Sequence, residues 1–240
     1  IMPLPKIATP TYELELPSTG KNIKYRPFLV KEEKLLVLAL ESENTKEITT
    51  AIKNVIKACI LSRGVKVETL PTFDIEYLFL NIRGKSVGEE IEVNIVCPDD
   101  GETYVPVKIN IDEIGVEKSE KHTNKIKVDD SLTMEMKYPS LDQFIKSNFD
   151  FSEDAGMDQS FDLVANCIEK IYNSEEAWTS ADCTKKELID FLEQMNSSQF
   201  KEIEKFFETM PKLSHEVEVV NPKTEVKSTV VLEGLSSFFA

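Results

Sequence analysis

Two short segments of this 240-residue chain have the residue spacing of metal-binding turns. They are Cys97-Pro98-Asp99-Asp100-Gly101 and Asn221-Pro222-Lys223-Thr224-Glu225, and a run of alternating apolar residues precedes each. The frame is that of a Cys-Pro-x-Cys-Gly zinc knuckle, in which the turn directs two thiolates toward one ion. Of the four ligand positions that two such turns would supply, only the first is a thiol. The other three are Asp100, Asn221 and Thr224. We therefore expect two degenerate knuckle hairpins, related by duplication or by convergence, with no metal and no cofactor.

Other reactive residue types do not form a recognisable catalytic set. Gly84-Lys85-Ser86 ends like a phosphate-binding loop, but Phe79 stands where that loop needs its first glycine. The two histidines, His122 and His215, belong to no metalloprotease helix and to no nucleophile motif. The four cysteines are far apart in the sequence, so we expect no disulfide framework. The sequence thus predicts a protein that is not an enzyme; the alternative is a metal-dependent or hydrolytic enzyme whose site one sequence does not reveal.

The elements that would position these residues are hairpins and helices. Alternation of apolar and polar residues around turn residues predicts four β-hairpins, at residues 12–28, 90–111, 126–136 and 217–232. Apolar residues at steps of three and four predict helices at residues 32–40, 45–61, 74–83, 140–148, 158–172, 185–195 and 197–210. Strands do not alternate with helices along the chain, which favours an α+β fold of short antiparallel hairpins packed with helices.

The chain divides by pattern into two domains. Residues 1–116 hold the first hairpin, three helices and the Cys97 hairpin, whereas residues 117–240 read as a mostly helical domain with hairpins at both ends. The highly charged stretch 117–125 is the expected linker.

Composition limits the classes of partner. The chain has 28 Lys and Arg against 43 Asp and Glu, a formal net charge of −15. Since nucleic-acid binding depends on neutralising phosphates with basic residues, we expect no nucleic-acid partner. No apolar run is long enough to span a membrane and the first residues lack the apolar core of a signal peptide, so we expect a soluble protein in a cytoplasm-like compartment. A host-directed adaptor with an acidic surface is a further alternative.

Two groups of residues have the composition of docking sites. Tyr25, Arg26 and Phe28 combine residue types that are common at interface centres. Leu235, Phe238 and Phe239 form a second apolar group in the last residues of the chain. Both groups are predicted to bind partners, and the alternative for each is packing within the protein itself.

With these segments in place, the chain resembles the T4-type bacteriophage baseplate hub family, whose members are hub subunits or hub-assembly proteins. The likeness extends in order over nearly the whole chain. It rests on residues 4–21, 25–34, 73–83 and 85–89, on Cys97-Pro98, on Gln199-Phe200, Phe206-Phe207 and Met210-Pro211, and on residues 232–239.

The resemblance implies a non-enzymatic component of a contractile tail. It would bind other baseplate and hub proteins, and it would act in the host cytoplasm during assembly. It either stays in the virion as a structural part or is released as a chaperone; the sequence leaves both open, and it leaves the oligomeric state open.

Overall fold

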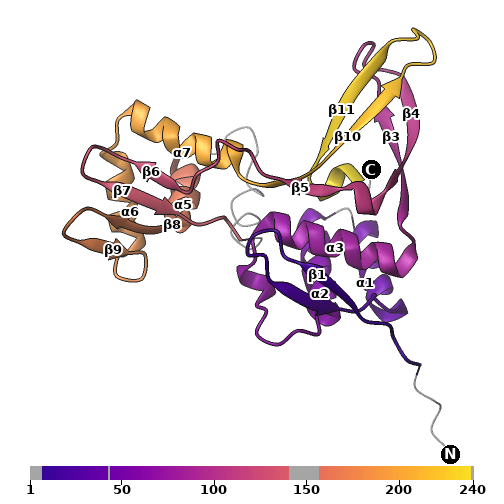
Figure 1. Ribbon diagram of the computed structural model, residues 1–240, viewed down its shortest axis with the longest axis horizontal. Helices are drawn as coiled ribbons and strands as arrows, with labels where there is room; N and C mark the ends of the chain where they lie inside the picture. The colour runs from indigo at the N-terminus through magenta and orange to yellow at the C-terminus, as the bar shows by residue number, and fades with distance from the viewer. Residues whose placement is uncertain (1–6, 43, 141–156, 239–240) are drawn as a thin grey trace, which may run out of the picture. The chain divides into compact units, whose positions relative to one another are not determined.

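The computed structural model describes residues 7–42, 44–140 and 157–238 (Figure 1). The chain forms two compact units. Unit 1 comprises the residues up to Val67, Phe73–Glu117 and the residues from Lys212 onward. Unit 2 comprises Glu68–Thr72 and Lys118–Pro211. The chain therefore leaves unit 1 in its middle and returns to it for the last strands.

Unit 1 begins with a hairpin followed by helices. Strands β1 (Tyr12–Glu15) and β2 (Asn22–Tyr25) pair antiparallel with Leu14 opposite Ile23. The helices are α1 (Val30–Glu41), α2 (Thr45–Cys59) and α3 (Thr72–Val87), and a short 3-10 turn, η1 (Val67–Thr69), precedes α3. Helix α3 is apolar on most of its sides, and Leu78, Leu80 and Ile82 are completely buried. These helices confirm the predictions for residues 32–40, 45–61 and 74–83.

The rest of unit 1 is built from strands. Strands β3 (Glu90–Val96) and β4 (Tyr104–Asn110) form one two-stranded sheet. A second sheet has the order β11-β10-β5. Its strands are β5 (Gly115–Glu117), β10 (Lys212–Val220) and β11 (Lys227–Glu233). Short 3-10 turns, η2 (Ile111–Glu113) and η3 (Leu235–Phe238), follow β4 and β11.

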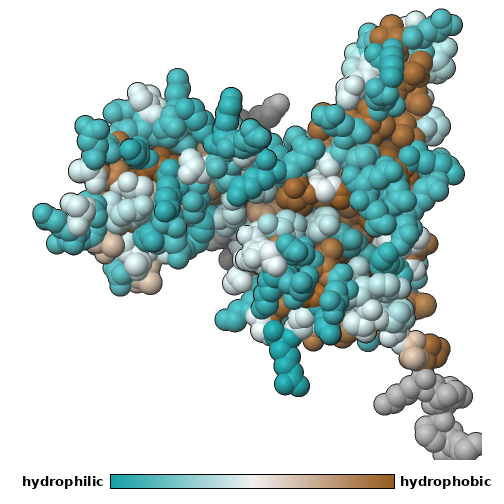
Figure 2. Space-filling model, in the orientation of Figure 1, coloured by the Kyte–Doolittle hydropathy of each residue, from teal (hydrophilic) through white to brown (hydrophobic). Residues whose placement is uncertain are grey.

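The β3-β4 and β10-β11 hairpins extend side by side, and we call them together the hairpin arm (Figure 1). Alternate side chains of each hairpin are buried: Ile91, Val93 and Ile95 on β3, and Val217 and Val219 on β10. Figure 2 shows hydrophobic residues running along the arm between hydrophilic ones. An isolated two-stranded hairpin is only marginally stable in water. Each hairpin of the arm therefore depends on contacts outside its own two strands.

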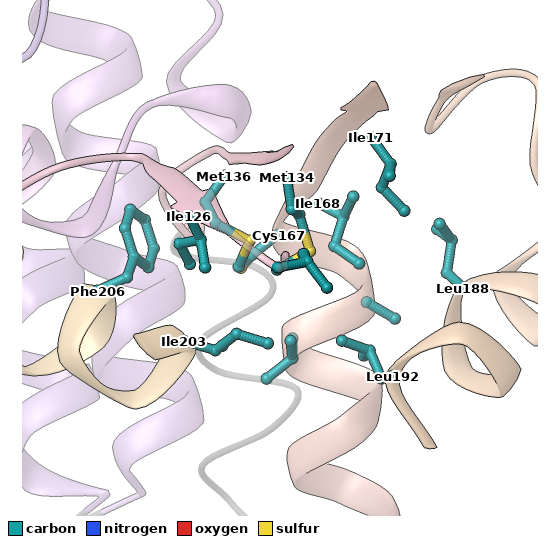
Figure 3. Packing of buried hydrophobic residues seen from close by; sticks show 13 residues of the cluster. Ile126, Met134, Met136, Cys167, Ile168, Ile171, Leu188, Leu192, Ile203 and Phe206 are labelled. Atoms are coloured by element: carbon teal, nitrogen blue, oxygen red, sulfur yellow. The ribbon is translucent and has the colours of Figure 1, made fainter. Parts of the chain in front are cut away.

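Unit 2 has a four-stranded antiparallel sheet covered by helices. The sheet order is β6-β7-β8-β9. The strands are β6 (Lys125–Lys127), β7 (Thr133–Met136), β8 (Ile168–Tyr172) and β9 (Ala177–Thr179). The helices are α5 (Met157–Cys167), α6 (Lys185–Glu193) and α7 (Ser197–Thr209). Figure 3 shows the core, where Met134 and Met136 of the sheet face Leu192 and Ile203 of the helices.

Helices α6 and α7 begin where the sequence provides capping residues. Thr184 and Glu187 form a reciprocal capping box at the start of α6, and Asn196 and Gln199 do the same for α7. These caps account for the starts of both helices at the predicted residues, 185 and 197, and the helices end within two residues of the predicted ends.

The α+β class with short antiparallel sheets is confirmed, but the mostly helical second half is not. The predicted helix at residues 158–172 ends at Cys167, and Ile168–Tyr172 is a strand. Its two isoleucines, Ile168 and Ile171, are three residues apart, which is a helical spacing. A register shift opposite Glu135 and Met136 lets them pair with Met136 and Met134 of β7, so strand pairing overrides the helical pattern. Strand β9 was not predicted, and most of the predicted helix at residues 140–148 lies outside the described residues.

The last hairpin belongs to unit 1, whereas the sequence pattern placed it in a C-terminal domain beginning at residue 117. The reason is a long-range pairing, because Leu213 of β10 lies opposite Val116 of β5. The predicted linker coincides with the passage into unit 2 after Glu117. Within it, His122 stacks on Tyr138 with ring centroids 5.6 Å apart, so this part of the charged stretch is packed within unit 2.

Candidate functional site

Helix α1 presents an apolar surface to solvent. Leu38 is 60% exposed, Leu35 is 51% exposed and Val30 is 71% exposed. With the neighbouring large apolar residues they form what we call the α1 face: Leu29, Val30, Leu35, Val37, Leu38 and Leu40. At 3.6 residues per turn these positions are spread over most of the solvent side of the helix, away from the buried Glu32 and Ala39. Scattered exposed apolar residues are ordinary, but a helix whose solvent side is largely apolar is typical of an interaction surface. The α1 face is therefore the main candidate functional site of unit 1.

The arrangement follows from what α1 turns inward. Its buried residues are Glu32 and Ala39, so a carboxylate and a methyl group occupy the positions where larger apolar residues would serve a core. Glu32 is held by Arg26, whose Nη2 lies 3.0 Å from Oε1, and by the backbone N–H of Leu29 at 2.7 Å. Burial alone would raise the pKa of Glu32, but hydrogen bonds from Arg26 and Leu29 bring this pKa below its ordinary value. Because Glu32 and Ala39 occupy the buried side of α1, most of the large apolar side chains of this helix face solvent.

A shallow depression of about 310 Å³ lies beside this face. Leu35 of α1 and residues of α2 line it, namely Lys46, Glu47, Thr50, Ala51 and Asn54. The sequence predicted a helix over residues 32–40 but not which of its sides faces solvent. The signal that could have revealed the face is the near-continuous apolar run at residues 35–40, which is too wide for one buried stripe of a helix.

The two knuckle-like turns meet at the end of the hairpin arm. The amide nitrogen Nδ2 of Asn221 lies 3.0 and 3.1 Å from the two carboxylate oxygens of Asp99, and 2.9 Å from Oδ2 of Asp100. The hydroxyl of Thr224 also donates to Asp99. We call Asp99, Asp100, Asn221 and Thr224 the turn cluster. Residues more than 120 positions apart in the sequence are therefore joined by hydrogen bonds.

The turn cluster is buried on one side and charged on the other. Asn221 and Cys97 are each only 1% exposed, whereas Asp99 is exposed. Hydrogen bonds from Thr224 and Asn221 lower the pKa of Asp99, and those from Thr103 and Asn221 lower the pKa of Asp100. Burial and the nearby carboxylates raise the pKa of the Cys97 thiol. At neutral pH the turn cluster therefore holds two carboxylates, and the thiol of Cys97 in the same turn is protonated.

The residues predicted to bind partners lie mostly in the interior of unit 1. Tyr25 and Phe238 are each 2% exposed, Phe28 is half-buried, and Arg26 pairs with the buried Glu32. This packing corresponds to the alternative considered for both groups. Phe239 and the side chain of Leu235 lie outside the described residues, and partner binding by the two groups remains a prediction.

The phosphate-loop-like segment and the two histidines have structural roles. Gly84 lies inside α3, and a Cβ there would come within 3.3 Å of Ile111, so close packing accounts for the glycine. Both histidines are engaged: His122 with Thr209 and Tyr138, and His215 with the carbonyl of Glu113 at 3.2 Å. Across residues 7–42, 44–140 and 157–238, no group of three or more His, Cys, Asp or Glu residues is placed to hold a metal ion.

Unit 2 has one apolar hollow of note, with a volume of about 280 Å³. Trp178 of β9 and Phe191 of α6 are among its lining residues, which also include Leu132, Ile171, Cys183, Glu187 and Leu188. The carboxylate of Glu187 is used by the α6 cap, so the hollow offers apolar contact and, as a reactive group, the free thiol of Cys183. No described helix has both the length and the apolar character needed to cross a membrane.

The arrangement described so far is that of a two-unit protein with exposed apolar contact surfaces, as expected of a component of a larger assembly. Comparison with known families agrees with this class. Residues 9–240 match the family described as T4 bacteriophage base plate protein, and the chain belongs to that family. No curated protein and no solved structure matches the chain. Family membership gives the protein a structural role in the phage baseplate, in contact with other baseplate proteins.

Proposed function

We propose that this protein is a component or an assembly factor of the hub of a contractile phage tail, and that it works by binding other baseplate proteins without catalysing a reaction. Membership of the baseplate family supports the setting. The α1 face is the observation that carries the binding role, because a baseplate protein with an uncovered apolar helix has a surface that a neighbour in the assembly can bury.

The apolar area of the α1 face sets the energy that a partner could gain. Fully burying an exposed leucine side chain contributes about 1.5 to 3 kcal/mol, and Leu35 and Leu38 are 51% and 60% exposed, so covering both is worth roughly 2 to 3 kcal/mol. That is enough to alter an affinity by about one to two orders of magnitude, since each 1.4 kcal/mol corresponds to a factor of ten. Exposed apolar groups that anchor interfaces are usually few and central, and these two leucines lie one helical turn apart.

The bonding and protonation of the buried reactive side chains support the proposal that the protein is not an enzyme. The buried carboxylates of Glu32 and Asp74 accept hydrogen bonds from Leu29 and Ser18, and the Cys97 thiol is protonated at neutral pH. The lining of the unit 2 hollow is apolar apart from Glu187, which caps α6, and the thiol of Cys183, which is not accompanied there by a histidine or a second carboxylate. We propose that the protein acts in the host cytoplasm while the hub is built; retention in the virion and release after assembly are the two alternatives.

The test is binding to purified baseplate proteins of the same phage. The double variant Leu35→Gln/Leu38→Gln removes apolar contact area while keeping good helix formers. Its matched control is Val226→Gln/Val231→Gln, which alters exposed valines at and near β11 of the arm. We expect the α1 variant to retain its unfolding midpoint and lose at least tenfold in affinity, while the control binds as the parent does. A parent protein that binds none of the baseplate proteins contradicts the function, whereas equal loss in both variants contradicts only the assignment to α1.

A further inference from the structure

The two turns of the hairpin arm share a backbone conformation as well as a sequence frame. In each turn, the fifth residue has a positive φ, which is 68° at Gly101 and 61° at Glu225. In each, the N–H of that residue donates to the carbonyl of the first at 2.9 Å, from Gly101 to Cys97 and from Glu225 to Asn221. Glu225 is the one non-glycine residue with positive φ in the described chain. The second turn thus keeps the knuckle conformation at a position where glycine is absent.

The positions that would hold zinc in a pair of knuckles converge. They are Cys97 and Asp100 in the first turn, and Asn221 and Thr224 in the second. Asn221 reaches Asp100 directly, and Thr224 reaches the same network through Asp99. Cys97 is tied to the same network, because its backbone N–H donates to the carbonyl of Thr103 at 2.8 Å and the hydroxyl of Thr103 donates to Oδ2 of Asp100 at 2.6 Å.

The orientation of the Asn221 amide is fixed. Its Oδ1 accepts the backbone N–H of Lys223 at 2.9 Å, so the NH₂ group must point at the carboxylates. Oδ1 of Asp100 accepts the N–H groups of Glu102 and Thr103, each at 3.0 Å. The carboxylate oxygens are therefore satisfied by donors of the protein itself.

We propose that the turn cluster is a metal-free zinc-ribbon site, in which hydrogen bonds from Asn221 and Thr224 to Asp99 and Asp100 replace the bonds from four ligands to a zinc ion. A structural zinc ion holds two hairpins together by bonding to both turns. The turn cluster joins the same two turns through donors on one and acceptors on the other. Strand β5 pairs only with Lys212–Ser214 of β10, so toward the turns each hairpin has two strands, a form that is marginally stable in water, and this connection holds the end of the arm together.

The direct test restores the missing ligands. The variant D99N/D100C/N221C/T224C has four thiols at the ligand positions and lacks the Asp99 charge, which would oppose thiolate formation. We expect it to bind one zinc ion per chain, to give the absorption of tetrahedral cobalt thiolate when loaded with Co²⁺, and to unfold at a higher temperature with zinc than without. The matched control adds C97S, and we expect its zinc affinity to fall at least tenfold.

Three results would overturn the proposal. One is a folded four-cysteine variant that takes up no zinc, and another is a C97S control that binds zinc equally well. The third is one tightly held zinc ion in the purified parent protein. If the four-cysteine variant does not fold even with zinc, a double-mutant cycle in the parent chain decides. We expect N221L and D100A to couple by roughly threefold or more in the unfolding equilibrium constant, and additive effects would refute the direct hydrogen bond.

Discussion

The equivalence of the two turns predicts opposite effects for two substitutions at matched positions. Glu225→Gly should stabilise unit 1, because it relieves a side chain held at φ 61°, and Gly101→Ala should destabilise it, because it places a side chain at φ 68°. A residue with a Cβ in the left-handed region costs about 1 to 2 kcal/mol, and the greater freedom of glycine in the unfolded chain offsets part of this.

The expected magnitudes follow from the surroundings of each site. A Cβ added at Gly101 meets nothing within 4 Å, so its cost is the backbone term alone, about 1 kcal/mol. Glu225 is exposed, and its replacement by glycine should gain about 0.5 to 1 kcal/mol. Gly115→Ala is the control, because a Cβ there also meets nothing within 4 Å but Gly115 does not have a positive φ. The control should lie within about 0.5 kcal/mol of the parent.

The assay is urea unfolding followed by two signals. The only tryptophan, Trp178, lies in unit 2, so its fluorescence reports that unit, whereas far-ultraviolet circular dichroism reports both. We expect the dichroism transition to move in opposite directions for Glu225→Gly and Gly101→Ala while the tryptophan transition stays in place. If Glu225→Gly destabilises the protein as much as Gly101→Ala does, the two turns are not conformationally equivalent and the reasoning fails.

Three further predictions concern buried ionisable groups. Burial raises the pKa of Asp74 although Ser18 donates hydrogen bonds to it, so the stability of the parent protein should fall as the pH rises from about 4 through the raised folded-state pKa. Asp74→Asn lacks this titration, so its urea midpoint should rise relative to that of the parent over the same pH interval. Burial and then Lys118 lower the pKa of His122, so protonation of this residue should lower the stability of unit 2 as the pH falls below about 6.5. Urea midpoints followed by Trp178 fluorescence should therefore change less between pH 6.5 and 5 in His122→Gln than in the parent. Glu32→Ala leaves the guanidinium of Arg26 without its carboxylate and should lower the unfolding free energy by about 2 to 3 kcal/mol; thermal unfolding that matches the parent would contradict this.

Local patterns were sufficient for the elements whose partners are close in sequence. Each of the four predicted hairpins is present, because a turn with its flanking alternation specifies both strands at once. The starts of α6 and α7 were predictable from Thr184 and Asn196, whose side chains satisfy the first backbone N–H groups of each helix.

Features that depend on distant residues were not predictable in the same way. Residues 115–117 have no strand pattern of their own, and they form a strand because Val116 pairs with Leu213 of β10. Ile168–Tyr172 is a strand because it pairs with β7. The two knuckle-like turns were recognisable individually from their proline spacing, but their contact joins Asp99 to Asn221 across 122 positions. The exposure of Leu38 was also hidden, because sequence alone does not say which apolar face of a helix is left uncovered.

The most direct test of the binding role uses a photo-crosslinking amino acid at position 38 in phage-infected cells. The control carries the same group at position 193, an exposed position at the end of α6. We predict that position 38 forms a covalent product with another baseplate protein of the phage, identified by mass spectrometry, and that position 193 does not form this product. If position 38 gives no product with a baseplate protein while baseplates assemble normally, the α1 face is not buried by a neighbour and the account is contradicted.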